Sequence, residues 1–205
     1  MPGERKERRM NKMVALTGIV SCILYFISVG AFLITHTEVA LTIWESMTIF
    51  GAIVETIVLI YVSSFLKTPD TVRKAMLVFL SSLCALTGAA HIINITVTRR
   101  LMAEGVEVPA YFQIGQWPSV EMAADYLAWG FFMGLALLCV SLPLRENDRR
   151  LKAMKIVALI SGILCLGGFC SAVMINENIW YIAILGYGIG IPVLCFQMSQ
   201  RAKSK

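Results

Sequence analysis

Five ionisable residues, one of them a histidine, lie inside stretches of this chain that are apolar enough to cross a lipid bilayer. They are Glu45, Glu55, His91, Glu121 and Asp125. An ionisable side chain at such a depth costs about 2.5–3.5 kcal/mol on insertion scales, so it normally faces a protein interior or a water-filled cavity. A histidine beside carboxylates can hold and pass a proton near neutral pH, or bind a cationic or hydroxylated ligand. The residue types therefore indicate a polar site without specifying its ligand.

The spacing of the polar residues places them on one face of each of three predicted helices, because residues three or four apart share a helix face. The second predicted helix carries Glu45, Thr48, Ala52 and Glu55; the third carries Cys84, Thr87, His91, Asn94 (or Ile95) and Thr98; the fourth carries Glu121, Asp125, Trp129 and Phe132. We expect these three stripes to converge. The predicted ligand-binding residues are Glu45, Glu55, His91, Asn94, Glu121, Asp125 and Trp129, with His91 and Asp125 as candidate acid and base.

The depth of each residue sharpens this prediction. Counted from the helix ends opposite the termini at 1.5 Å per residue, His91 and Asp125 both lie about 10 Å inside. Glu45 and Glu121 lie about 5–6 Å inside, and Glu55 lies near the midplane. The pattern predicts an outward- or laterally-open cavity between the second, third and fourth helices. Glu55 has no basic partner on these helices, so we expect it to be protonated unless water reaches it.

Two other interpretations of the polar residues remain open. Glu45 and Glu121 lie near helix N-termini, where ordinary solvated carboxylates are stabilised by the helix dipole. Polar side chains can also hold helices together, at an average of about 0.6 kcal/mol per interaction. Five ionisable groups on three consecutive helices favour a functional cavity over both.

Composition determines the class of protein. Hydrophobic residues make up 58% of the 205 residues, charged residues 15%, and mean hydropathy is +0.74. A soluble domain carries about a quarter charged residues. The apolar runs are continuous and not alternating, which predicts an all-α bundle of six transmembrane helices and argues against a β-barrel. The predicted spans are Met13–Thr35, Leu41–Leu66, Lys74–Thr98, Pro118–Leu142, Ala153–Ile175 and Ile179–Met198, so residues 13–198 form the membrane domain between basic tails at 1–12 and 199–205.

The distribution of basic residues predicts the orientation of the bundle. Sixteen of the eighteen lysines and arginines fall on the side that holds both termini, and only Arg99 and Arg100 fall on the other. The positive-inside rule then places both termini in the cytoplasm. The net charge of +5 reflects this topology and contact with anionic lipid, so we expect the lipid bilayer as a partner and no nucleic acid.

Several chemistries lack the residues that they need. The only other histidine is His36, so neither a zinc site with several histidines nor a bis-histidine haem is supplied, and we expect no metal and no cofactor. Lys74 and Lys155 lie at the first and third positions of their predicted spans, so we expect no buried charge in the last two spans and no lysine deep in a span for a retinal Schiff base. The six cysteines lie within spans and form no Cys-x-x-Cys pair, which is typical of buried apolar residues. Glycines at 162, 167, 168, 186 and 190 predict close helix packing.

Three segments of the central third carry a resemblance to known proteins. Residues 91–100, Trp117-Pro118-Ser119 and the run 127–138 (LAWGFFMGLALL) resemble small six-helix proteins of uncharacterised prokaryotic membrane families. The resemblance implies a multi-pass protein of a prokaryotic inner membrane. It implies no activity.

Three functions from different classes follow from these observations. The first is binding or transport of a small or lipid-like molecule, with the acid–histidine cluster handling protons. The second is an intramembrane enzyme that uses His91 and a carboxylate as acid and base on a lipid- or sterol-like substrate. The third is a non-catalytic membrane partner or sensor. The small size of the chain favours a homodimer for a transporter, and the first, fifth and sixth helices are expected to serve as scaffold.

Overall fold

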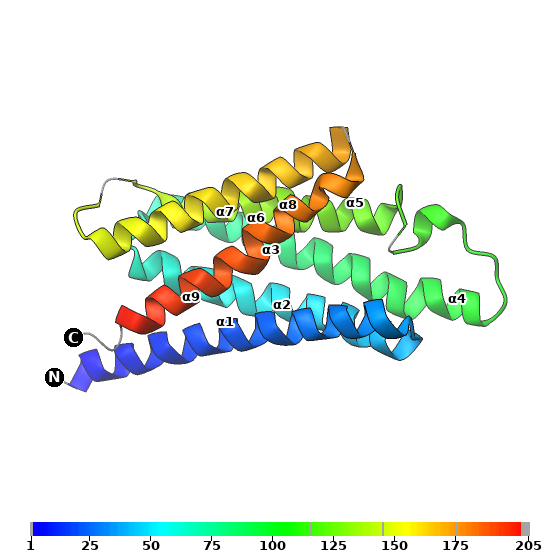
Figure 1. Cartoon of the computed structure of the whole chain (residues 1–205), viewed down its shortest axis with the longest axis horizontal. Coiled ribbons are helices and arrows are strands. Elements are labelled where there is room, and N and C mark those ends of the chain that lie inside the picture. The colour runs from blue at the N-terminus through cyan, green and yellow to red at the C-terminus, as the bar shows by residue number, and fades with distance from the viewer. Residues whose placement is uncertain (1, 115, 145, 175, 202–205) are drawn as a thin grey trace.

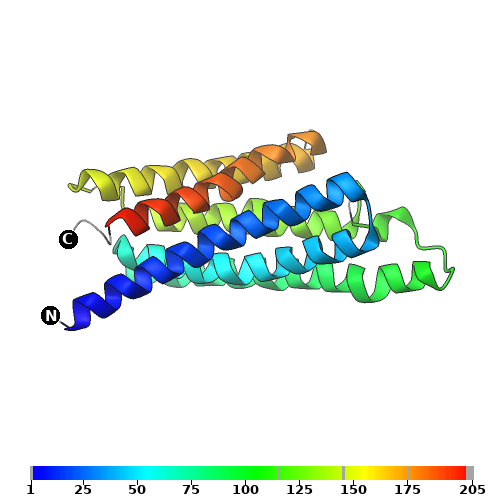
Figure 2. The same cartoon turned by 60° about the horizontal axis from the view of Figure 1, so that its bottom comes forward.

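The computed structural model describes residues 2–114, 116–144, 146–174 and 176–201, which contain helices and no strand. Six helical stretches in these ranges are long and apolar enough to cross a membrane. They are Arg9–Thr35, Glu38–Phe65, Asp70–Ala103, Val120–Ser141, Arg149–Met174 and Asn178–Gln200. They run alternately up and down in one bundle (Figures 1 and 2). The predicted all-α fold with six long apolar helices is confirmed.

Three of the six stretches are single helices, and three are built from several elements. The first two are α1 (Pro2–Thr35) and α2 (Glu38–Phe65). The third joins α3 (Asp70–Ile93), η1 (Asn94–Thr98) and α4 (Arg99–Ala103), and the short helix η2 (Ala110–Phe112) follows. The fourth joins α5 (Val120–Tyr126), η3 (Leu127–Phe132) and α6 (Met133–Ser141). The fifth is α7 (Arg149–Met174), and the sixth joins η4 (Glu177–Trp180), α8 (Tyr181–Ile184), η5 (Leu185–Ile189) and α9 (Gly190–Arg201).

The helix ends differ from the sequence prediction at two places. Residues 2–12, expected as a basic tail, form the first turns of α1. The third stretch continues past Thr98 to Ala103, and its 34 residues span about 50 Å. Arg99 and Arg100 therefore sit on a helix and not in a loop, which gives Arg99 a fixed direction.

The bundle has two distinct ends (Figure 1). The terminal end holds the first turn of α1, the last turn of α9 and the connections 66–69 and 142–148. The loop end holds the connection between α1 and α2 and the long segment 104–119. Side-chain caps begin two helices at the loop end: Thr37 accepts from the N–H of Ala40, and Ser119 accepts from the N–H of Met122.

Glycines bring the helices close together on the side formed by α6, α7 and α9. A side chain at Gly134 would meet the carbonyl oxygen of Gly162, and one at Gly162 would meet that of Gly134. A side chain at Gly190 would collide with Ser161. The predicted close packing is confirmed at Gly162, Gly168, Gly186 and Gly190. It is wrong at Gly167, whose added Cβ meets nothing within 4 Å.

Three of the six stretches contain a π-helical turn: η1, η3 and η5. A π-turn inserts one extra residue, so it rotates the residues on either side of it relative to each other, and such turns are frequent at functional sites. Here they carry Asn94, Trp129 and Tyr187, which are all buried. The irregular turns therefore lie where polar and aromatic side chains enter the interior.

Candidate functional site

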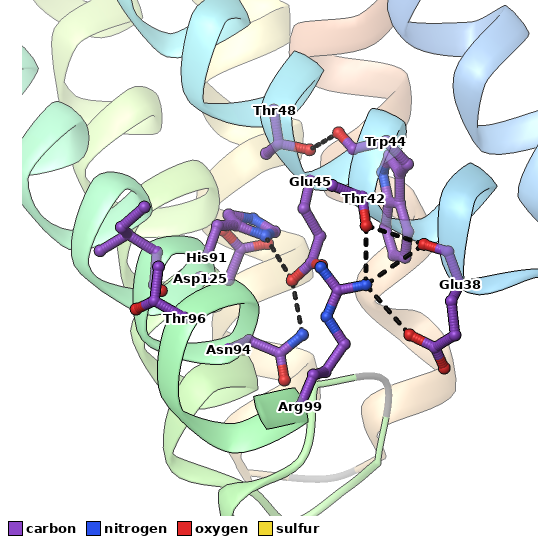
Figure 3. A network of polar contacts seen from close by, with 11 residues as sticks. Glu38, Thr42, Trp44, Glu45, Thr48, His91, Asn94, Thr96, Arg99 and Asp125 are labelled. Atoms are coloured by element: carbon purple, nitrogen blue, oxygen red, sulfur yellow. Dashed lines mark hydrogen bonds and ion pairs between the residues drawn. The ribbon is translucent and has the colours of Figure 1, made fainter. Parts of the chain in front are cut away.

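Glu45 of α2 lies at the centre of a buried polar network at the loop end (Figure 3). Its Oε1 accepts a 2.6 Å hydrogen bond from Nδ2 of Asn94 and lies 3.6 Å from Nδ1 of His91. Its Oε2 lies 3.1 Å from Nη2 of Arg99. The side chain of Glu45 has no exposed surface. One carboxylate thus joins an amide, an imidazole and a guanidinium that come from a single continuous helix.

His91 connects this carboxylate to a second one. Its Nε2 lies 3.5 Å from Oδ1 of Asp125 on α5, while its Nδ1 faces Glu45. Both distances suit ion pairs and are longer than ordinary hydrogen bonds. Because each ring nitrogen faces a carboxylate oxygen, both contacts are attractive only when two protons are shared along the row Glu45–His91–Asp125. Asp125 is the accessible member, with 20% of its side chain exposed against 1% for His91.

Arg99 closes the network toward the surface, and sequence reasoning missed it. Its Nη1 lies 3.1 Å from Oε2 of Glu38 and donates to Oγ1 of Thr42 at 2.9 Å. Its Nη2 reaches Glu45, so the guanidinium joins an exposed carboxylate to a buried one (Figure 3). The predicted span ends at Thr98, which places Arg99 outside the helix. Its position on the stripe of His91, at i+8, was the signal that could have identified it.

The π-turn η1 explains how this helix presents so many polar groups. Asn94 and Thr98, the first and last residues of the turn, are buried, whereas Thr96 and Val97 are exposed. The sequence left Asn94 and Ile95 as alternatives for the stripe; the structure buries Asn94, and Ile95 is only partly buried. The wider turn lets His91, Asn94 and Arg99 all point toward Glu45.

A cavity of about 430 Å³ opens beside this network at the loop end. Its polar lining comes from Glu38, Asn94, Thr98, Arg99 and Gln113, and its apolar lining from Leu41, Met102, Ala103 and Ile114. Asn94 and Arg99 thus face the cavity and also bind Glu45. A molecule in the cavity would be separated from His91 by two side-chain contacts.

Two further residues of the fourth stripe, Glu121 and Trp129, are buried but keep unpartnered atoms. Glu121 and Trp129 lie one turn before and one turn after Asp125, and are 3% and 4% exposed. Neither Oε2 of Glu121 nor Nε1 of Trp129 has a hydrogen-bond partner among the described residues. The ring of Trp129 packs against that of Tyr187, with centroids 4.8 Å apart. Unpaired buried polar groups are costly and need an explanation such as a ligand or water.

The interpretation of Glu45 and Glu121 as solvated helix-end carboxylates is wrong. Both lie in first turns or near them, but their exposed fractions are 0% and 3%. The sequence gives depth along a helix axis, whereas burial depends on which neighbours cover that face. Here the long third stretch rises beside α2 and covers it (Figure 1).

Glu55 lies apart from the network, about ten residues further along α2. Its Oε1 accepts from the thiol of Cys22 on α1 at 3.7 Å, and its Oε2 has no partner among the described residues. Tyr25 of α1 and Tyr187 of η5 are electrostatic neighbours of both Glu55 and Asp125. The first and sixth stretches, expected as scaffold, therefore contribute side chains to the polar interior.

One buried charge was not expected. Lys155 lies on α7, within the fifth span, and only 2% of its side chain is exposed. Its Nζ donates to the carbonyl oxygen of Pro143 at 2.8 Å and lies 3.4 Å from Oε2 of Glu146. The prediction that the last two spans bury no charge is wrong, because a lysine near a helix end can extend to polar groups of the adjoining connection.

The described ranges contain no group of three or more His, Cys, Asp or Glu side chains that could hold a metal ion. No family model, curated protein or solved structure matches the chain. The resemblance carried by residues 91–100, 117–119 and 127–138 stays a prediction.

Proposed function

We propose that this chain is a multi-pass membrane protein, with both termini cytoplasmic, that binds a small or lipid-like molecule at the loop end of the bundle. Six helices of sufficient length and apolarity support insertion into a membrane. The concentration of basic residues at the terminal end supports the orientation. The proposed setting is a prokaryotic inner membrane.

The observation that carries the proposed binding role is the row Arg99–Glu45–His91–Asp125 beside the cavity. Buried ion pairs contribute little net stability, because desolvation offsets their attraction. The chain buries Glu45 and His91, partly buries Arg99 and Asp125, and leaves further buried polar atoms unpaired among the described residues, at a cost that helix packing does not offset. Ionisable groups inside a bundle typically mark ligand or proton pathways.

The cavity fits an amphiphilic ligand. Its lining combines a guanidinium, a carboxylate, two amides and a hydroxyl with aliphatic and thioether side chains. The polar part of the ligand would contact Arg99 and Asn94, and so change the charge that Glu45 and His91 experience. Proton release or uptake through the partly exposed Asp125 would then accompany binding, which is how a proton-coupled transport step would be built.

A second function, acid–base catalysis on a lipid-like substrate, is favoured by one specific observation. His91 lies between two carboxylates, and one of them, Asp125, is partly exposed. This arrangement can take a proton from one position of a substrate and return it to another. The molecule that copurifies with the His91→Gln variant distinguishes binding from isomerisation. A binding protein should retain the same molecule as the wild type, whereas an isomerase should retain an isomer of it.

The test is the identity of molecules that copurify from native membranes. We expect mass spectrometry of extracts to find a molecule enriched in the wild type and lost in Ala103→Trp, which fills the cavity without altering the ion network. Ala110→Trp, on the adjoining loop and outside the cavity lining, is the matched control and should retain it. An isomeric molecule in His91→Gln would favour the enzyme. Equal retention by wild type and Ala103→Trp would overturn the binding role.

A separate experiment tests the membrane topology. Single cysteines at Glu104 and Asn147, in a background without the native six, should react differently with an impermeant thiol reagent in intact cells. We expect labelling at position 104 and not at 147. Labelling at 147 would overturn the proposed orientation without affecting the binding result.

A further inference from the structure

A second cavity lies at the opposite end of the molecule, between α1 and α2. Its volume is about 330 Å³, and its lining is Asn11, Ile60, Tyr61, Ser64 and Phe65. The same two helices line a smaller apolar cavity of about 100 Å³ further into the bundle, formed by Met13, Val14, Thr17, Val54, Ile57 and Val58. The α1–α2 pair thus offers a polar recess at the terminal end and an apolar recess toward the middle.

The charges around the polar recess are mainly positive. Nη1 of Arg73 on α3 donates to Oγ of Ser64 at 3.3 Å, so a guanidinium reaches the rim of the recess. Lys12 follows Asn11 on α1, and Lys67 follows Phe65 by two residues; both are exposed. Among the side chains that the structure describes near the recess, the carboxylate of Asp70 pairs with Arg73 at 3.0 Å and with Lys74 at 2.9 Å.

The side chains of the recess suit an anionic group. The amide of Asn11 and the hydroxyl of Tyr61 can each donate a hydrogen bond. The hydroxyl of Ser64 already donates to the carbonyl oxygen of Ile60 at 3.1 Å. Arg73 adds a planar guanidinium, whose geometry matches phosphate oxygens. A cationic ligand would meet these donors and several positive charges, so the recess disfavours it.

We propose that the recess binds the phosphate of an anionic phospholipid, with an acyl chain lying along α1 and α2 over the apolar cavity. Basic pockets between helices on the cytoplasmic side of a membrane are a known chemical solution for such headgroups. The apolar cavity is what favours a lipid over free phosphate, because free phosphate has no group to place there. This inference uses the proposed membrane insertion but not the binding role of the loop end.

The experiment measures lipid retention by native mass spectrometry after reconstitution in nanodiscs of phosphatidylcholine with added phosphatidylglycerol. Wild-type protein should retain phosphatidylglycerol selectively. Arg73→Gln should lower this retention by about fivefold, the factor expected for about 1 kcal/mol per basic residue at the surface. Tyr61→Phe, which removes one hydroxyl and little volume, should lower it by a smaller factor.

Arg100→Gln is the matched control, because it removes an exposed arginine at the loop end. Its retention of phosphatidylglycerol should equal that of the wild type. Equal losses in Arg73→Gln and Arg100→Gln would mean that overall charge and not the recess attracts the lipid, and would overturn the proposal. If the wild type retained phosphatidylcholine as well as phosphatidylglycerol, the proposal would also be overturned.

Inorganic phosphate separates the two sources of the anion. Added to the protein in detergent, it should not displace phosphatidylglycerol at equal concentration; displacement would identify a free-phosphate site instead of a lipid site. Protein that fails to enter nanodiscs at all would refute the proposed membrane insertion, and that outcome is seen before any lipid is measured.

Discussion

Apart from the buried Lys155, the bundle interior at the terminal end consists largely of aliphatic and thioether side chains, whereas at the loop end it contains carboxylates, an imidazole and a guanidinium. Fully buried residues of the terminal end include Leu59, Leu80, Leu137, Met154 and Met198. At the loop end Glu45, His91 and Glu121 take the corresponding positions. The π-turn η1 lies toward the loop end, whereas η3 and η5 lie near the middle of their stretches. One end is therefore packed for stability, and the other is arranged around charges that must stay together.

The largest effect that this comparison predicts is loss of stability in Glu45→Gln. The change leaves Arg99 and His91 facing a neutral amide, and breaking a buried ion pair on one side costs about 3–5 kcal/mol. The free energy of unfolding in bicelles would measure it. Glu38→Gln is the control, because Glu38 also contacts Arg99 but its side chain is 80% exposed, so its loss should stay below about 1 kcal/mol. Equal effects of the two changes would show that the network is not coupled through burial.

Shortening a buried side chain at the terminal end should lower stability by as much as Glu45→Gln or less. It should not affect the binding site at the loop end. Leu80→Ala removes a fully buried side chain and should cost about 2–5 kcal/mol. Leu77→Ala, one turn earlier and 38% exposed, should cost much less. Molecules retained in the loop-end cavity should be unchanged in both. Loss of retained molecules in Leu80→Ala would contradict the separation of the two ends.

The fold follows from the sequence because length and continuous apolarity define six helices, whatever their packing. The polar stripes also follow, since a period of three to four residues determines which side chains share a face. The network itself does not follow in full. Arg99 lies beyond the expected end of its helix, and the π-turn at Asn94 that turns it inward has no sequence signal of its own.

Contacts between distant elements were the least predictable part of the site. Glu55 meets the thiol of Cys22, which is 33 residues away on a helix expected only as scaffold. Trp129 meets Tyr187 from the last stretch. A helix pattern fixes the face on which a residue lies but not the helix that covers that face, so such partners need coordinates.

Glu55 itself should matter for protons more than for stability. Glu55→Gln keeps the oxygen that accepts from Cys22 and removes the group that can ionise. We expect a change in the free energy of unfolding of about 0.6 kcal/mol, the average for one polar contact between helices in a membrane. Proton flux into liposomes with an internal pH dye, driven by the molecule recovered from the wild type, should be abolished. Full flux in the variant would remove proton coupling and leave passive binding.

The smallest expected effect concerns Glu146, an acid in the connection at the terminal end. The backbone N–H of Asp148, and then Lys155, hold the pKa of Glu146 below its ordinary value of 4.5. Because the folded-state pKa is the lower one, the stability that this carboxylate contributes is present above pH 4.5 and is lost as pH falls through the lowered value. Glu146→Gln should remove that part of the pH dependence, measured as unfolding free energy between neutral and acidic pH. Partly exposed ion pairs contribute little, so the difference from the wild type at neutral pH should be small. A loss of unfolding free energy as large as that in Glu45→Gln would mean that ion pairs at both ends contribute equally to stability. That result would contradict the proposed difference between the two ends.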